Sequence, residues 1–149
     1  MPFETRLFVK TGMIYLVLTF AVGAVLAAME AAGHPAPFII AVEHGHMGFI
    51  GWLVNVVVGV ALWMFPLDRE RFPETKGRYH SAIVLWCYGL LNVGLPMRIF
   101  SESWLALAGT ETIVRFALVL SAAMQLAAIV LVACIVWARV RQPAPVAKV

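Results

Sequence analysis

Apolar residues run in four long stretches along this chain, separated by short polar or Gly/Pro-containing segments. Each stretch is hydrophobic nearly all round rather than along one face, as in a membrane span. About 20 helical residues cross a bilayer core of about 30 Å, so each stretch can span a membrane. The pattern predicts an all-α membrane protein, a four-transmembrane-helix bundle in residues 1–141, with helices at about 7–32, 37–65, 80–100 and 111–139. A disordered tail is expected at 142–149.

Composition and charge narrow the class of protein further. Of 149 residues, 62% are hydrophobic and 13% are charged, against about 25% charged in soluble domains. The net charge of +3 comes from basic residues beside the apolar stretches, so the lipid bilayer and not nucleic acid is the expected partner. Cys87 and Cys134 both lie within apolar stretches and are expected to be small core residues, not disulfide or metal ligands.

The positions of lysine and arginine predict the topology. They precede the first stretch, separate the second from the third and follow the fourth; they are Arg6, Lys10, Arg69, Arg71, Lys76, Arg78, Arg139, Arg141 and Lys148. The two other connecting segments contain neither residue. The positive-inside rule therefore places both termini in the cytoplasm, and we expect an integral protein of a bacterial inner membrane.

Ionisable residues inside the stretches are the candidates for function, because they are costly in a bilayer. In the predicted topology seven of them fall in the outer half of the membrane: Glu43, His44, His46, Arg98, Glu102, Glu111 and Arg115. A purely structural interpretation also exists, since Arg98 with Glu102 and Glu111 with Arg115 have the i,i+4 spacing of helix ion pairs. His34 lies in an outer turn, and His80 opens the third helix on the opposite side.

The spacing of His44 and His46 restricts what they can bind. Residues two apart on a helix point about 200° apart, so a single metal held by both would require the helix to open. Gly45, Gly48 and Gly51 recur every three residues beside them and leave a strip that admits either a porphyrin or another helix. The spacing therefore suits two groups on opposite sides of this helix, or one haem together with a hydrogen-bonded partner.

Three further polar residues have simpler expected roles. Asn55 and Asn92 lie within the second and third helices and are expected to form interhelical hydrogen bonds. Glu43, beside His44, is either a proton-active carboxylate or a group that orients a histidine, and spacing alone does not separate these roles.

The segment 44–67, HGHMGFIGWLVNVVVGVALWMFPL, resembles a histidine-bearing helix of the catalytic subunit of haem-copper oxidases, the cbb3 type included. The resemblance implies a b-type haem with His44 and His46 as iron ligands in the outer half of the membrane. Arg98 and Arg115 would then hold the haem propionates, because a guanidinium matches a carboxylate in a two-bond fork. The implied function is electron transfer if the iron is six-coordinate, and NO or O2 binding if it is five-coordinate. Four helices are too few for a complete oxygen reductase.

Two other functions remain open at this stage. A cofactor-free accessory or assembly subunit of a respiratory complex would keep the glycines for helix packing and the Arg/Glu pairs for interhelical contacts. A copper binder would use Met47 with the histidines. A homodimer is also expected, because it would bury four histidines between two second helices. No nucleotide motif and no nucleophile with an adjacent base is found, so no enzymatic reaction is assigned.

Overall fold

The structure, a computed structural model, describes residues 1–67, 69–70, 72–109 and 111–140, and every regular element in this part of the chain is a helix. Its elements are α1 (Phe3–Ala31), α2 (Phe38–His46), the π-helix η1 (Met47–Val54), α3 (Asn55–Met64), α4 (Ser81–Leu107) and α5 (Thr112–Trp137). The segments α2, η1 and α3 form one continuous rod, so there are four spans long and apolar enough to cross a membrane. This confirms the predicted fold class. The tail expected at 142–149 lies outside the described residues.

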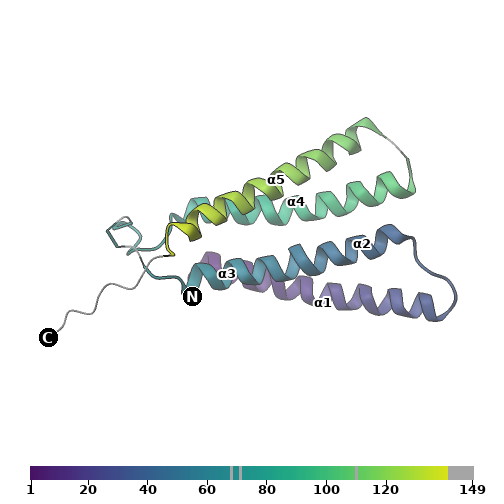
Figure 1. The fold of residues 1–149 in the computed structure, drawn as a ribbon, viewed down its shortest axis with the longest axis horizontal. Helices are drawn as coiled ribbons and strands as arrows, with labels where there is room; N and C mark the ends of the chain where they lie inside the picture. The colour runs from purple at the N-terminus through teal and green to yellow at the C-terminus, as the bar shows by residue number, and fades with distance from the viewer. Residues whose placement is uncertain (68, 71, 110, 141–149) are drawn as a thin grey trace.

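The four spans form two antiparallel hairpins (Figure 1). One hairpin pairs α1 with the rod of α2, η1 and α3, and the other pairs α4 with α5. The N-terminus and the segment between α3 and α4 lie at one end of the bundle, the terminal end, and the two short turns lie at the other, the far end. In Figure 1 the outermost helices, α1 and α5, diverge toward the far end, with α2 and α4 between them.

Two helix ends differ from the prediction. Helix α1 begins at Phe3, four residues before the predicted start, because Pro2 suits a helix N-terminus and Glu4 complements the helix dipole there. Helix α4 continues to Leu107, so the predicted end at 100 is wrong. No glycine or proline interrupts the segment after Phe100 until Gly109, whose φ is +129°. As a result Glu102 belongs to a full helical turn and not to a polar loop.

The glycine strip predicted beside the histidines is occupied by a helix. A Cβ built at Gly51 would lie 2.5 Å from the ring of Tyr15, and one at Gly48 would lie 3.2 Å from Cγ2 of Thr19. Both neighbours belong to α1, which lies against η1. Gly45 has no neighbour within 4 Å of such a Cβ. Two of the three glycines therefore provide close helix contact, and the strip is not an open slot for a porphyrin.

Side-chain burial shows where the two hairpins pack together. The main apolar cluster consists of Phe8, Val58, Leu62, Tyr79, Val84, Cys87, Leu91 and Ala128. Most of these residues come from the terminal half of the bundle. Large apolar side chains face outward on every span, as lipid contact requires: Val17, Phe20, Trp86, Phe116 and Trp137 are among them. Cys134 is also exposed, so the prediction of a core position is right for Cys87 and wrong for Cys134.

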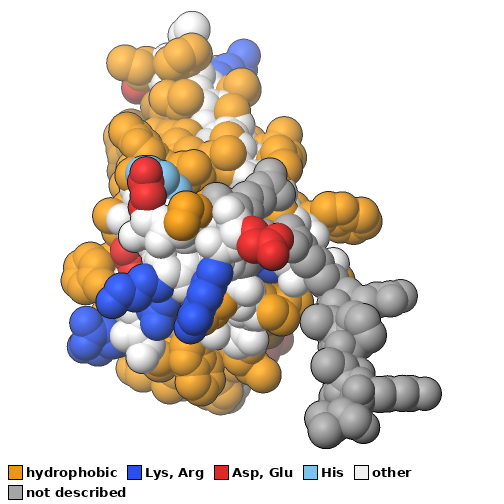
Figure 2. All heavy atoms as spheres, turned by 90° about the vertical axis from the view of Figure 1, so that its left-hand side faces the viewer, with side chains coloured by type: hydrophobic (Ala, Val, Ile, Leu, Met, Phe, Trp, Pro, Cys, Tyr) orange, Lys and Arg blue, Asp and Glu red, His pale blue; other side chains and the backbone are white. Residues whose placement is uncertain are grey.

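Basic side chains gather at the terminal end, which faces the viewer in Figure 2. Exposed members of this group are Arg6, Lys10, Arg69, Lys76 and Arg78. Among the described residues, only Arg98 and Arg115 carry positive charge in the far half. This distribution is the one on which the topology prediction rests.

Hydroxyl pairs join the hairpins in the terminal half. Thr5 Oγ1 lies 3.1 Å from the Tyr79 hydroxyl, and Thr11 Oγ1 lies 2.8 Å from the Tyr88 hydroxyl. Burial raises the pKa of Tyr79, which lies just outside the spans. The phenol therefore stays protonated and available for this contact up to a higher pH than an exposed tyrosine.

Asn55 and Asn92 form a reciprocal amide pair between the rod and α4, as the sequence predicts. Asn55 Nδ2 donates to Asn92 Oδ1 at 3.1 Å, and Asn92 Nδ2 donates to Asn55 Oδ1 at 2.9 Å. Asn55 is fully buried and also donates to the Gly51 carbonyl at 2.9 Å. Amide pairs of this kind hold spans at a fixed depth relative to each other.

Asn55→Ala is expected to lower the stability of the folded protein by about 1–2 kcal/mol, because it leaves the Asn92 amide buried without its partner. Thermal unfolding in detergent, followed by size-exclusion chromatography, measures the change. The double variant Asn55→Ala, Asn92→Ala is the control and should lose less than the sum of the two single variants. Strict additivity would contradict the pairing.

Candidate functional site

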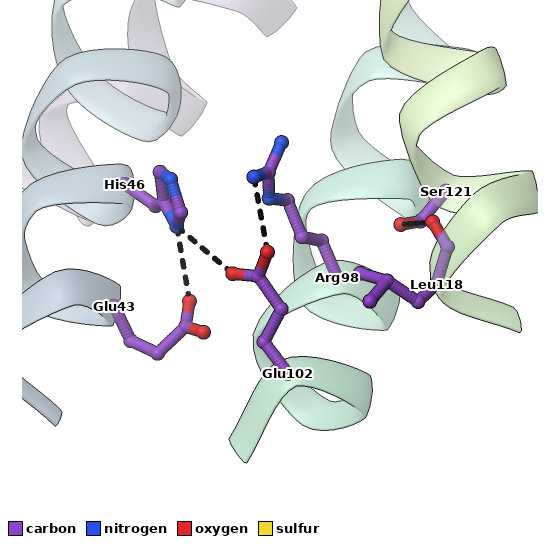
Figure 3. A network of polar contacts seen from close by, with 6 residues as sticks. All are labelled: Glu43, His46, Arg98, Glu102, Leu118 and Ser121. Atoms are coloured by element: carbon purple, nitrogen blue, oxygen red, sulfur yellow. Dashed lines mark hydrogen bonds and ion pairs between the residues drawn. The ribbon is translucent and has the colours of Figure 1, made fainter. Parts of the chain in front are cut away.

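His46 lies between two carboxylates that come from different hairpins (Figure 3). Its Nδ1 is 3.3 Å from Oε2 of Glu43, one turn earlier on α2. The same nitrogen is 3.5 Å from Oε2 of Glu102, which projects from α4. The contact exists because α4 extends past residue 100, and because Glu43 and His46, three residues apart, share a face of α2.

Arg98 completes the group. Its Nη2 donates to Oε1 of Glu102 at 3.0 Å, which confirms the i,i+4 ion pair predicted from the sequence. Glu102 therefore faces an arginine with one oxygen and a histidine with the other. We refer to Glu43, His46, Arg98 and Glu102 as the α2–α4 cluster.

The side chains of the α2–α4 cluster are largely buried, so leaving their polar atoms without partners is costly. Glu43 is only 4% exposed, and the side chains of His46 and Glu102 are 22% and 20% exposed. Buried polar atoms that lack a hydrogen-bond partner among the described residues concentrate here and on the adjoining turns: Glu43 Oε1, His44 Nδ1, Arg98 Nε, Ser101 Oγ and Glu102 Oε2. A buried carboxylate oxygen is costly unless a donor or a cation satisfies it.

His44 faces the opposite way from His46. A Cβ built at Gly23 of α1 would lie 3.0 Å from Cε1 and 3.5 Å from Nε2 of His44. Its other nitrogen, Nδ1, is buried and without a hydrogen bond to the described residues. The divergence expected from the spacing is therefore present. Helix α1 occupies the space in which a large ligand of His44 would have to lie.

The wider turns of η1 do not bring the two histidines together. η1 begins at Met47, directly after His46, and ends at Val54; the next residue, Asn55, donates a hydrogen bond from its side chain to the Gly51 carbonyl. π-helical turns often occur beside functional sites. Here the change of register begins after the histidines, so one metal ion held by both remains geometrically excluded.

Two other predicted candidates lie apart from the cluster. Arg115 is exposed on α5, and among the described residues no ion pair joins it to Glu111. His34 is exposed in a far-end turn, while His80 precedes α4 at the terminal end, as expected from its place in the sequence. Of the four residues expected to bind haem, the structure brings together His46 and Arg98 and separates His44 and Arg115 from them.

The donor atoms of Glu43, His46 and Glu102 suit a metal ion. One atom from each residue can be chosen so that all three lie within 4.8 Å of one another. Zinc binds imidazole nitrogen and carboxylate oxygen at about 2.0–2.2 Å, which puts its ligands about 3.4 Å apart. Small side-chain rotations would close this difference. Three protein ligands also leave at least one coordination position for water or another molecule.

Part of this site is predicted by the sequence. Glu43, His46 and Glu102 are predicted at one depth, and a histidine-orienting role is among the expectations for Glu43, although there the neighbouring histidine is His44. Glu102 was expected only as the partner of Arg98. The i,i+3 spacing of Glu43 and His46, with an acidic residue at the same depth on another span, is the signal that could have identified all three.

Comparison with known proteins assigns no family to this chain. No family model, no curated protein and no solved structure matches it. The likeness of residues 44–67 to a haem-copper oxidase helix therefore rests on the motif alone.

Proposed function

We propose that this chain is a membrane-embedded metal-binding protein whose α2–α4 cluster holds one divalent first-row cation through Glu43, His46 and Glu102. The observation that carries the proposal is Oε1 of Glu43, a buried carboxylate oxygen without a hydrogen-bond partner among the described residues. Its carboxylate group faces an imidazole and a second carboxylate (Figure 3). One nitrogen and two carboxylate ligands favour Zn²⁺, Fe²⁺ or Mn²⁺.

A proton on His46 is the alternative to a metal ion. Protonation would balance the charges of the α2–α4 cluster, since two carboxylates would then face an arginine and an imidazolium. Nδ1 has two carboxylate neighbours, however, at 3.3 and 3.5 Å. Its single N–H bond points in one direction and can donate a well-aligned hydrogen bond to only one of them. Oε1 of Glu43 would still lack a donor. A metal ion accepts ligands from several directions at once and satisfies both carboxylates.

A b-type haem is the second candidate, and the direction of the two histidines favours it. His44 and His46 diverge, as the resemblance requires, and the carboxylate contacts at Nδ1 of His46 are of the kind that orient iron-binding imidazoles. The fit is partial: His46 and Arg98 could take the iron and a propionate, whereas His44 lies against α1. When bound, haem would supply electron transfer or the binding of NO or O2. The chain's part would be to hold the group and orient the imidazole.

The proposal includes a location. Four apolar spans indicate an integral membrane protein. The basic terminal end supports cytoplasmic termini in a bacterial inner membrane, in which case the α2–α4 cluster lies in the half of the membrane away from the cytoplasm.

Calorimetric titration of the detergent-purified, metal-stripped protein with Zn²⁺ tests the proposal. We expect one ion per chain, and an increase in Kd of at least about 100-fold for His46→Ala and for Glu43→Gln, since each removes a ligand from a three-ligand set. His34→Ala and His80→Ala are matched controls that remove exposed histidines and should bind like the wild type.

Absorption spectra of the same protein, expressed with adequate haem supply, separate the candidates. A Soret band that disappears in His46→Ala, together with the absence of zinc binding, would replace the metal proposal with the haem protein. A colourless protein that binds no zinc would contradict both, and would favour the cofactor-free accessory or assembly subunit of a respiratory complex.

A further inference from the structure

We infer that the bound cation is the clasp of the far half of the bundle: it holds the two hairpins together there, and its removal lets them separate. The inference rests on the proposed function and assigns the metal ion a conformational role. Three features of the described residues support it: where the hairpins are joined without the ion, where they are not, and which atoms meet in the α2–α4 cluster.

The terminal half of the bundle is joined independently of the cluster. Arg139, near the end of α5, donates to carbonyls at the end of α3, and the Thr11–Tyr88 hydroxyl pair joins α1 to α4. The reciprocal pair of Asn55 and Asn92 adds a contact near mid-membrane. These contacts, with the apolar cluster around them, would serve as the hinge.

In the far half the hairpins are joined through the rod and α4. Helix α2 contacts α4 but not α5, and α1 does not contact α5. The outermost helices diverge at this end (Figure 1). Toward the far end, the described residues include one ion pair between the hairpins, that of His46 with Glu102.

The atoms that meet in the cluster make the link weak without a cation. Within α2 the Glu43–His46 distance is 3.3 Å, and within α4 the Arg98–Glu102 distance is 3.0 Å, whereas the distance across the junction is 3.5 Å. The closer contacts are thus internal to each helix. With a neutral imidazole and both carboxyl groups ionised, Glu43 and Glu102 repel each other across the junction. A cation that takes an oxygen from each changes this repulsion into attraction.

Distances between spin labels at the far end test the clasp. We would place labels at Phe38→Cys on α2 and Ile113→Cys on α5, both highly exposed at 83% and 74%. The background carries Cys134→Ser, because that thiol is exposed, and keeps the buried Cys87. The control pair is Trp63→Cys with Trp137→Cys, which reports on the terminal end. Pulsed electron paramagnetic resonance is recorded in lipid nanodiscs with Zn²⁺ and after chelation.

Chelation is expected to lengthen and broaden the far-end distance by several ångströms and to leave the control distance unchanged. Adding Glu102→Gln should give the longer distribution whether or not Zn²⁺ is present. Zinc binding with an unchanged far-end distance would overturn the clasp and leave the proposed function intact. Failure to bind zinc at all would overturn both. A change at the terminal end as well would show general unfolding and would also count against the clasp.

Discussion

Gly12→Leu is expected to loosen the packing of α1 on the rod and to give the largest loss of stability in detergent. A Cβ at Gly12 would lie 2.7 Å from Cγ2 of Val56, 3.1 Å from the Trp52 carbonyl oxygen and 3.3 Å from the Val56 nitrogen. The last two are backbone atoms and cannot rotate away. Small residues at such crossings are what lets membrane helices approach closely.

Gly12→Leu is expected to lower the free energy of unfolding by about 3 kcal/mol or more, which is the upper end of the range for overpacked contacts. The fraction of protein that stays monodisperse after heating measures it. Gly89→Leu is the matched control, because a Cβ at Gly89 has no neighbour within 4 Å. If both variants behave alike, close packing of α1 on the rod does not hold this hairpin together.

Arg139→Ala is expected to have the next largest effect on stability. The guanidinium is almost completely buried, with only 3% of the residue exposed. It donates to the Pro66 carbonyl at 3.0 Å and to those of Leu62 and Phe65, and it lies 5.6 Å from the centre of the Tyr79 ring. The last carbonyls of a helix lack partners within the helix, so Arg139, just after α5 of the other hairpin, caps α3.

Removing this side chain should lower the free energy of unfolding by about 3 kcal/mol, because several buried carbonyls lose a charged donor at once. Arg139→Lys keeps the charge without the planar fork and should recover only part of the loss. Lys10→Ala removes an exposed basic residue at the same end and is expected to change little. A loss in Arg139→Ala no larger than in Lys10→Ala would contradict the capping role.

The fold could be predicted because few arrangements satisfy four apolar stretches in a bilayer. Backbone polar groups in lipid must be paired within each segment, so a long apolar stretch is a helix whatever its neighbours are. The ends of the helices follow from the sequence less directly. Residues near the membrane surface, such as those after Phe100, are helical unless a glycine or proline interrupts the helix. The exposure of Cys134 depends on the rotation of α5 about its axis, which an all-round apolar sequence does not specify.

The sequence predicts how deep in the membrane the candidate site lies but not which residues form it. Counting residues from the ends of the spans placed Glu43, His46 and Glu102 at one level. Which of the two histidines faces α4 depends on how the rod rotates against α1. That rotation is set by close contacts such as Gly51 with Tyr15 and Gly23 with His44, which join residues far apart in the sequence. A motif read along one helix cannot supply this information.

X-ray absorption at the zinc edge of the zinc-loaded protein tests the central claim most directly. We expect one imidazole nitrogen together with carboxylate and water oxygens at about 2.0–2.1 Å. The imidazole contribution should disappear in His46→Ala and persist in His44→Ala, because His44 faces α1. A shell with two imidazoles, or one that His46→Ala leaves unchanged, would contradict a metal site formed by Glu43, His46 and Glu102.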